Sequence, residues 1–523
     1  METQKYPIGI QTFSSIIEEG FTYVDKTGFI PALLKGRYYF LSRPRRFGKS
    51  LLLSTLHAYF EGRRDLFKGL ALENADVDWE PSPVLHFDFN SEDFTQMEGL
   101  NHLLDSYLSY HEKIYGGGEK DASIPQRFRD LIRSAYEKTQ RKVVILIDEY
   151  DKPLLGIEEN GEVFEKNQSL LKGFFGNLKS MDRYIRFAFI TGVARFNKVS
   201  IFSDLNNLYD ISMTEEYADI CGWTEKELVD NFRPGILRLA EAGEMSEEET
   251  LKALRGFYDG YLFAPKGSRL YNPFSVLLAL QNREIAPYWF ETGTPTFLAR
   301  RIRERGVAMP SLNGIYRKRE SLVAVGMNSA DAVPLMFQTG YLTIESYDPR
   351  MRRMQLRFPN REVEIGFAMN LLPLYAPPTE NQDGQFSIHK FQDDLFNGDP
   401  DAFMTRLATL LKDIPYGQHS EAAYQSITYI LCLLCSLDSA IERHSYKGRS
   451  DLEVKTPDYI YIFEFKYNGS VEEAMQQIRE RDYAGRYSLD TRTIYLIGAN
   501  FSDKVPERGL TGYVIEKVNK TLH

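Results

Sequence analysis

The sequence predicts an α/β protein of several domains, the first of which is a parallel sheet that carries a phosphate-binding loop. Residues 43–50 read RPRRFGKS and lie between a predicted strand and a predicted helix. Residues 143–147 read VVILI, a continuous apolar run that is typical of strands covered on both faces, as in parallel sheets. At 523 residues, the chain is long enough for two to four domains.

The first element is the loop that ends in Gly48-Lys49-Ser50. Residues 37–42 predict the strand before it, and residues 51–60 predict the helix after it. A strand, a loop and a helix in this order direct backbone N–H groups at phosphate oxygens. We expect Lys49 to reach the β and γ phosphates of a nucleotide and Ser50 to bind Mg²⁺. The residues expected around the phosphates are Arg46, Phe47, Gly48, Lys49, Ser50 and Leu51.

The loop departs from the usual pattern at one position. Such loops normally begin with a glycine, and this one begins with Arg43. From the loop alone, a basic surface turn is therefore the alternative interpretation. The loop contains three arginines, Arg43, Arg45 and Arg46, which could add positive charge around the phosphates or form structural ion pairs.

The second element is the acidic pair Asp148-Glu149, which follows the apolar run 143–147. An acid at the tip of such a strand can hold the metal, and an acid one place later can orient the attacking water. We therefore expect Asp148 to bind Mg²⁺ and Glu149 to be catalytic. The alternative is a pair of acids that begins an ordinary loop after a core strand.

Two further strands are predicted beside these elements, over residues 84–89 and 185–191. The second of them ends in TGVARF. Thr191 and Arg195 are candidates to contact the γ phosphate from a neighbouring strand tip. Arg195 is equally compatible with a plain surface arginine.

Short motifs with different sequences are distributed along nearly the whole chain. They are YVDKT (23–27), RPRRFGKS (43–50), LIDEYDKPL (146–154), ITGVARF (190–196), NNLYDIS (206–212), CGWTEKEL (221–228), YDGYLF (258–263), YNPFSV (271–276), YWFETGTPTFL (288–298) and QTGYLTI (338–344). Together they resemble the AAA-ATPase-like proteins common in gut bacteria. In that family RPRRFGKS is the usual loop, so the resemblance implies an ATP site in spite of Arg43. It also implies a P-loop core of the RecA/AAA-like type over residues 1–223.

The middle of the chain is predicted to be helical and then basic. Residues 224–300 open with a capping box formed by Thr224 and Glu227, and they resemble the helical lid of many such ATPases. Residues 301–375 are rich in arginine and contain a predicted hairpin around 348–350, which suggests a winged-helix-like segment. Such a segment can bind DNA or pack against the core, and the net charge of −10 argues against a generally basic, nucleic-acid-coating surface.

The C-terminal part, residues 380–523, carries a second candidate site. A turn over residues 456–459 predicts a hairpin, and the period of two along its second strand puts Glu464 and Lys466 on one face. Pairing across this turn would place Asp451 opposite Glu464. Two carboxylates can hold Mg²⁺ or Mn²⁺, and a lysine can orient or activate water near a phosphodiester.

The pattern D-x12-E-x-K resembles the PD-(D/E)XK nuclease superfamily, and the AAA-ATPase-like family typically ends in such a domain. The resemblance implies an α/β restriction-endonuclease-like fold with Asp451, Glu464 and Lys466 in the site. Gln477 matches the polar residue often found in the following helix, and Glu421 resembles the upstream acid of many members. The alternative is an ion pair on the surface, because E-x-K on a strand is common.

The combined expectation is a P-loop ATPase coupled to a metal-dependent nuclease acting on DNA or RNA, with ATP and Mg²⁺ or Mn²⁺ as cofactors. One alternative is a regulatory ATPase whose C-terminal domain only binds nucleic acid or a protein. Another is an ATP-binding interaction protein with two slow or silent sites. The oligomeric state is left open.

The three cysteines bear on the cellular compartment and give no indication of a metal site. Cys221, Cys432 and Cys435 provide no disulfide framework, and the chain shows neither a signal peptide nor a membrane-spanning stretch. We therefore expect a cytoplasmic protein without membrane partners. Cys432 and Cys435 lie three apart in an apolar segment without a second pair of ligands, so they are expected in the core rather than at zinc.

Overall fold

The protein forms two compact units, each of which is described by itself. One consists of Met1–Trp289 and Arg317–Met354, and the other of Phe290–Tyr316 and Gln355–His523. The division into 1–223, 224–300, 301–375 and 380–523 stays a prediction. The computed structural model describes residues 4–90, 92–119, 121–155, 157, 161–195, 201–202, 207–289, 296–323, 331–375, 388–412, 414, 419–435, 452–506 and 508–518.

The first unit is built on a five-stranded sheet with the strand order β2-β3-β4-β1-β5. Its strands are β1 (Tyr38–Ser42), β2 (Val84–Asp88), β3 (Val143–Asp148), β4 (Ile185–Gly192) and β5 (Tyr209–Asp210). All four pairings are parallel, so the carboxyl ends of the strands meet at one edge of the sheet. The predicted parallel sheet is confirmed, and β4 separates the loop after β1 from the acids after β3.

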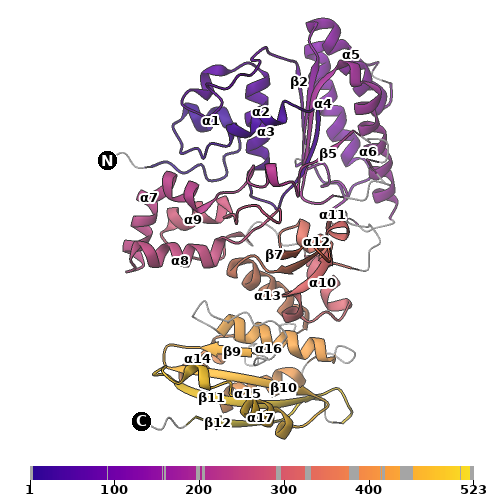
Figure 1. The fold of residues 1–523 in the computed structure, drawn as a ribbon. Helices are drawn as coiled ribbons and strands as arrows, with labels where there is room; N and C mark the ends of the chain where they lie inside the picture. Colours follow the sequence, from indigo (N-terminus) through magenta and orange to yellow (C-terminus); the bar gives the residue numbers. More distant parts are fainter. Residues whose placement is uncertain are drawn as a thin grey trace. The chain divides into compact units, whose positions relative to one another are not determined.

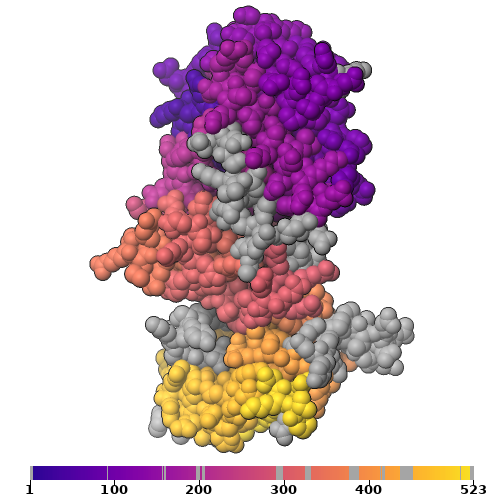
Figure 2. Space-filling model, turned by 90° about the vertical axis from the view of Figure 1, so that its right-hand side faces the viewer, coloured from indigo at the N-terminus to yellow at the C-terminus, as the bar shows by residue number. Residues whose placement is uncertain are grey.

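Helices cover both faces of this sheet (Figure 1). Helix α3 (Lys49–Phe60) packs on one face, together with the short helices α1 (Phe13–Glu18) and α2 (Ile30–Leu33). Helices α4 (Gly99–Tyr115), α5 (Ile124–Thr139) and α6 (Glu162–Ser180) cover the other face, and their outer surface is the purple region in the upper part of Figure 2. Phe128 of α5 stacks on Phe174 of α6 at 4.1 Å between ring centroids, and Phe87 of β2 packs edge-on against both rings.

The helical segment after the sheet has its own apolar core. Its helices are α7 (Glu225–Ala242), α8 (Glu247–Tyr258) and α9 (Pro273–Asn282). The predicted capping box is present: the Thr224 hydroxyl accepts the Glu227 N–H at 3.2 Å, and the Glu227 carboxylate accepts the Thr224 N–H at 2.8 Å. Trp223 stacks on Phe232 at 4.8 Å, which joins the start of α7 to this core.

The predicted hairpin around residues 348–350 is also confirmed. Strands β7 (Thr343–Asp348) and β8 (Arg353–Arg357) pair in a three-stranded sheet of order β6-β8-β7, where β6 is Ile315–Lys318. Two short helices, α11 (Arg319–Val323) and α12 (Val333–Gln338), precede β7. Across the parts of the chain that the structure describes, no helix has the length and apolar character needed to cross a membrane.

The second unit contains a four-stranded mixed sheet of order β12-β11-β10-β9, in which β10 and β11 are parallel. Helix α17 packs its apolar side on this sheet through Met475 and Ile478, against Ile460 and Ile462. Cys432 and Cys435 are buried on α16, which agrees with the expected core position. The elements are α10 (Thr296–Glu304), α13 (Arg361–Tyr375), α14 (Ile388–Phe396), α15 (Pro400–Lys412), α16 (Glu421–Cys435), β9 (Leu452–Lys455), β10 (Tyr459–Tyr467), α17 (Val471–Glu480), β11 (Thr493–Ser502) and β12 (Gly509–Lys517).

Candidate functional site

The loop after β1 turns into helix α3 through Gly48. Gly48 has φ +93°, a left-handed conformation that side chains other than glycine rarely adopt, and it occupies the N-cap position of α3. In the described structure no side chain caps this helix start. Its first N–H groups are therefore available to an anion, as a phosphate-binding loop requires. Ser50 and Leu51 lie in the first turn of α3.

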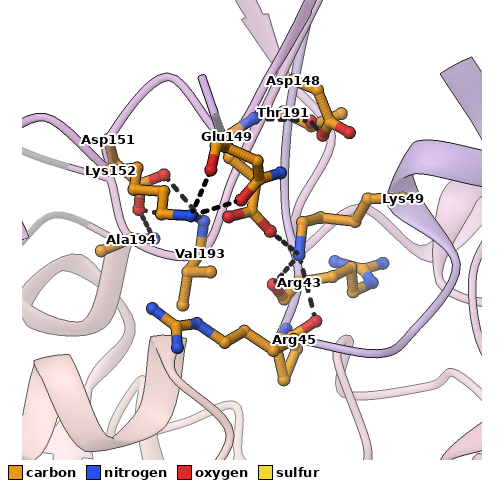
Figure 3. Close-up of polar contacts among 12 residues, drawn as sticks. Arg43, Arg45, Lys49, Asp148, Glu149, Asp151, Lys152, Thr191, Val193 and Ala194 are labelled. Atoms are coloured by element: carbon orange, nitrogen blue, oxygen red, sulfur yellow. Dashed lines mark hydrogen bonds and ion pairs between the residues drawn. The ribbon is translucent and has the colours of Figure 1, made fainter. Parts of the chain in front are cut away.

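Lys49 is the buried cation of this loop. Its side chain is only 3% exposed, and its Nζ donates to the carbonyl oxygens of Arg43 (3.1 Å) and Pro44 (3.2 Å). The same Nζ lies 3.9 Å from Oε1 of Glu149, across the sheet edge (Figure 3). The structure thus brings together the lysine after β1 and the acid after β3, which are 100 positions apart in the sequence.

Asp148 and Glu149 both contact Thr191 on the neighbouring strand β4. Asp148 is buried at the end of β3, where its carboxylate accepts a hydrogen bond from the Thr191 hydroxyl on β4. The Glu149 N–H in turn donates to the Thr191 hydroxyl oxygen at 3.4 Å, and Glu149 has φ +51°. A left-handed conformation is costly for a residue other than glycine and often marks a functional position. Thr191 therefore orients both acids, and its expected contact with a γ phosphate stays a prediction.

A further acid lies beside this pair. Asp88 at the end of β2 is in register with Asp148 at the end of β3. Burial, and secondarily the Asp148 charge, raises the pKa of the Asp88 carboxyl. Sequence reasoning did not single out Asp88, although an acid near the end of the predicted strand 84–89 was the signal that could have found it.

Asp151 ties the acidic turn to the loop after β4. Its carboxylate is fully buried and accepts the N–H groups of Val193 (3.0 Å) and Ala194 (2.6 Å), as Figure 3 shows. Burial raises the pKa of Asp151 to about 7. The two backbone donors oppose that shift, because they stabilise the ionised form. The turn that carries Glu149 is thus fixed to the neighbouring strand end.

The raised pKa predicts a pH-dependent stability. The Asp151 pKa is about 7 in the folded protein and about 3.9 in an unfolded chain. The folded state therefore keeps this proton up to a higher pH than the unfolded chain does. As a result, this carboxyl makes the protein less stable as the pH rises from about 4 to about 7. Asp151→Asn does not titrate, so its urea midpoint relative to wild type should rise between pH 5 and pH 8. Each pKa unit corresponds to about 1.4 kcal/mol.

The exposed carboxyl of Asp121 provides the control for this measurement. Asp121→Asn should follow the wild-type pH dependence throughout. If Asp151→Asn does the same, Asp151 ionises as easily in the folded protein as in the unfolded chain.

Arg43 has a structural role in the loop. The side chain is buried, and its guanidinium donates to the carbonyl oxygens of Ser212 (2.7 Å) and Tyr217 (3.1 Å). It also lies over the ring of Phe263, 4.1 Å from the centroid. Burial lowers the pKa of Arg43 to about 10. Arg43 is therefore not an exposed residue of a basic surface turn. Its guanidinium is hydrogen-bonded to backbone carbonyls rather than to the acids that an ion pair requires.

Two other cations near the loop, Arg46 and Arg195, also contact neighbouring side chains. Arg46 lies over the ring of Phe274 at 4.6 Å. Arg195 is buried and forms an ion pair with Asp210 on β5, so the interpretation of Arg195 as a plain surface arginine is wrong. Phe47 is buried as well, 4.7 Å from the ring of Tyr261. A role of these side chains toward a nucleotide stays a prediction.

The C-terminal hairpin has the predicted register. The Thr456 N–H donates to the Tyr459 carbonyl at 2.9 Å, and the ladder continues to the pair of Leu452 with Phe463. The residue before β9, Asp451, lies outside the described residues, so its expected place opposite Glu464 stays a prediction.

Glu464, Lys466 and Gln477 lie together. Glu464 is buried on β10, and the Lys466 ammonium lies 3.3 Å from its Oε1. The same ammonium donates to Oε1 of Gln477 on α17 at 2.6 Å. Gln477 Nε2 lies 3.4 Å from the Tyr483 hydroxyl, which adds a residue that the sequence did not reveal. These contacts hold the lysine beside the buried carboxylate.

Glu421 is not hydrogen-bonded to this group in the described structure. It is exposed in the first turn of α16 and accepts a hydrogen bond from Gln425 at 3.0 Å. Three residues later, Tyr424 packs against Tyr467, the last residue of β10, at 6.3 Å between ring centroids. Within the described ranges, no three His, Cys, Asp or Glu side chains gather as a metal site. Glu464 is a buried carboxylate whose oxygen chemistry suits Mg²⁺ or Mn²⁺, and Glu453 on β9 is buried as well.

Comparison with known proteins matches a family to each of the two parts of the chain that carry a candidate site. Residues 7–202 match the family described as Predicted AAA-ATPase, and residues 419–508 match the PD-(D/E)XK nuclease superfamily. The chain is also similar to an uncharacterized protein in the vnfD 5′ region of Azotobacter chroococcum mcd 1. The two share 36% identity over 535 residues, which cover 99% of this chain and 100% of the relative.

Proposed function

This chain belongs to the AAA-ATPase-like proteins that carry a C-terminal PD-(D/E)XK nuclease-superfamily domain, and we propose that it hydrolyses ATP and cleaves DNA or RNA. The observation that supports the ATPase best is the approach of Lys49 to Glu149 at the edge of the parallel sheet, at 3.9 Å. At this edge of the sheet, a phosphate-binding cation and a water-orienting acid can serve the same phosphoryl group.

At the first site, each group has a distinct task. The N–H groups at the start of α3 bind the phosphates, and the Lys49 ammonium binds the β and γ phosphates in place of the two carbonyls that it contacts here. Ser50 and Asp148 would hold Mg²⁺, which neutralises charge on the phosphates. Glu149 orients the attacking water, and the Thr191 hydroxyl keeps Asp148 and Glu149 in place.

At the second site, the chemistry centres on Lys466. Gln477 and Glu464 hold its ammonium on the face of the sheet that α17 covers. From there it orients or activates the water that attacks the phosphodiester. Glu464 and Asp451 would hold a divalent metal ion, which polarises the phosphate. Glu421 at the start of α16 is proposed as the upstream acid of the same site.

A second candidate function is regulation, with a C-terminal domain that binds nucleic acid or a protein partner without cleavage. The observation in its favour is that the Lys466 ammonium donates hydrogen bonds to both Gln477 and Glu464, as in a structural ion pair. The discriminating experiment is incubation of the full chain with plasmid, linear DNA and RNA, with Mg²⁺ or Mn²⁺, and with or without ATP. Cleavage supports the nuclease, whereas a gel shift without cleavage supports the regulatory function.

The ATPase itself is tested at Glu149. Glu149→Gln keeps the size of the side chain and removes the charge that orients water, so ATP hydrolysis should fall by about 10²-fold or more. ATP should still bind with a Kd within a few-fold of wild type, because Lys49 and the loop remain. Phosphate release and calorimetric ATP titration measure the two effects separately.

Glu165→Gln is the control, because Glu165 is an exposed acid on α6 of the same unit. It should hydrolyse ATP at the wild-type rate. If Glu149→Gln does so too, another acid orients the water, and Asp88 on the neighbouring strand tip becomes the next candidate.

A further inference from the structure

The motif QTGYLTI contributes a turn that contacts the nucleotide site. Gln338 is the last residue of α12, and Gly340 follows two positions later with φ +88°. Both residues belong to the same compact unit as the phosphate-binding loop. We call residues 338–340 the QTG turn. None of the roles assigned so far uses this turn.

One contact of the QTG turn is with the loop after β4. Oε1 of Gln338 accepts the N–H of Arg195 at 2.7 Å, and Nε2 of Gln338 donates to the carbonyl of Leu322 at 2.8 Å. The two residues before Arg195 donate their N–H groups to Asp151. The loop after β4 is thus held from two sides, by the acidic turn that carries Glu149 and by Gln338.

The other contact is with the phosphate-binding loop. A Cβ atom placed on Gly340 would lie 2.5 Å from Cγ and 2.6 Å from Cβ of Pro44, so the backbone of the turn lies directly against this proline. The carbonyl of Pro44 accepts a hydrogen bond from Lys49. Gly340 is therefore required both by its left-handed φ and by the closeness of the loop that holds Lys49.

The packing around the turn leaves room for movement. A cavity of about 120 Å³ is lined by Pro44, Arg195 and Gln338, among other residues. The loops are therefore not packed against the turn on every side. Beyond the pairing of β1 with β4, their relative position is set on this side by the hydrogen bond from Arg195 to Gln338 and by the contact between Pro44 and Gly340.

We propose that the QTG turn is a positioning element for ATP hydrolysis, in which Gln338 sets the loop after β4 and Gly340 sets the phosphate-binding loop. The proposal rests on the proposed ATPase function and names residues outside the motifs that bind phosphate. Gln338 does not reach the phosphates in this proposal; it acts through Arg195 and, beyond Arg195, through the Asp151 contact that fixes the turn of Glu149. Loss of Gln338 should therefore slow hydrolysis more than it weakens binding.

The first test is the split between kcat and ATP binding at Gln338. Gln338→Leu removes both hydrogen bonds at similar size, and kcat should fall about five- to tenfold, the effect of about one hydrogen bond. The Kd for ATP should stay within about twofold. Gln338→Glu keeps an acceptor for the Arg195 N–H and should recover part of the kcat. Wild-type kcat in Gln338→Leu, or an equal loss in kcat and affinity, overturns the proposal.

The second test compares two glycines of similar backbone conformation. Gly340→Ala forces Pro44 away and should raise the Kd for ATP about tenfold. Gly69→Ala is the matched control, because Gly69 has φ +80° and no atom within 4 Å of an added Cβ. It carries the backbone strain without the contact, so its Kd should equal that of wild type. Equal Kd values in the two variants overturn the assignment of Gly340.

Failure of the proposed function would look different from failure of this inference. A wild-type protein that binds no ATP refutes both the ATPase and the QTG turn. If the wild-type protein hydrolyses ATP, and Gln338→Leu, Gln338→Glu and Gly340→Ala have its kcat and its Kd for ATP, the role of the QTG turn alone is refuted. Thermal unfolding of each variant shows whether it is folded, and the Gly340 comparison decides if Gln338→Leu does not fold.

Discussion

Replacing Lys49 with methionine is expected to abolish ATP binding, with a rise in Kd of at least about 100-fold. Methionine keeps the apolar stem in its buried position and removes only the ammonium group. That group makes charge-assisted hydrogen bonds, each of which contributes about 1.5–3 kcal/mol, and a factor of ten in Kd corresponds to about 1.4 kcal/mol. Two such bonds to phosphate therefore account for 100-fold or more. Calorimetric titration with ATP and Mg²⁺ measures the effect.

Lys152 provides the control for this experiment. It lies in the same part of the molecule (Figure 3), and its Nζ donates to the carbonyl of Asn90 (3.1 Å) and to Oδ1 of Asn90 (2.8 Å). Lys152→Met removes a cation nearby but none from the phosphate-binding loop, so the Kd should change by less than about threefold. An unchanged Kd in Lys49→Met would refute the phosphate-binding role of this loop.

The second large effect is expected at Lys466. Lys466→Met should eliminate metal-dependent cleavage of nucleic acid, because the lysine is the cation held beside the buried Glu464. ATP binding should be unaffected, because Lys49 and Lys466 belong to different compact units. Loss of a catalytic acid or base typically costs 10²- to 10⁴-fold in rate. Time courses of plasmid nicking and linearisation, with ATP titration in parallel, measure both properties.

Lys504 is exposed in the same unit and gives the matched control. Lys504→Met should cut at the wild-type rate. If Lys466→Met also cuts at that rate, the lysine is a structural ion-pair partner and the cleavage arises elsewhere. If wild type never cuts, the regulatory function becomes the better account of this domain.

Much of the fold follows from local patterns in the sequence. The apolar run 143–147 predicted a buried parallel strand because a strand covered on both faces is typically a short, continuous apolar run. The register of the C-terminal hairpin followed from one turn, because the pairing of Thr456 with Tyr459 determines every later pair along two regular strands. The capping box at Thr224 was predictable for the same reason, since both partners lie within one helical turn.

The contacts between distant loops could not be predicted in this way. Arg43 binds backbone carbonyls, which every residue has, so no residue type elsewhere in the sequence marks its partners. Asp151 likewise binds backbone N–H groups. The burial of Lys49 was equally hidden, because the carbonyls that accept hydrogen bonds from its ammonium belong to the backbone of its own loop. Periodicity identifies elements, but it does not reveal which loops meet.

The order in which the chain contributes to its two units affects how the protein can be divided for study. The first unit takes up Met1–Trp289, the second takes up Phe290–Tyr316, and Arg317–Met354 returns to the first. A fragment that stops at Trp289 therefore contains the loop 43–50 and the acidic pair and yet lacks Gln338 and Gly340. An isolated first unit needs the segment 317–354 reattached through an artificial connection, and truncation from the C-terminus alone removes part of the first unit together with the second.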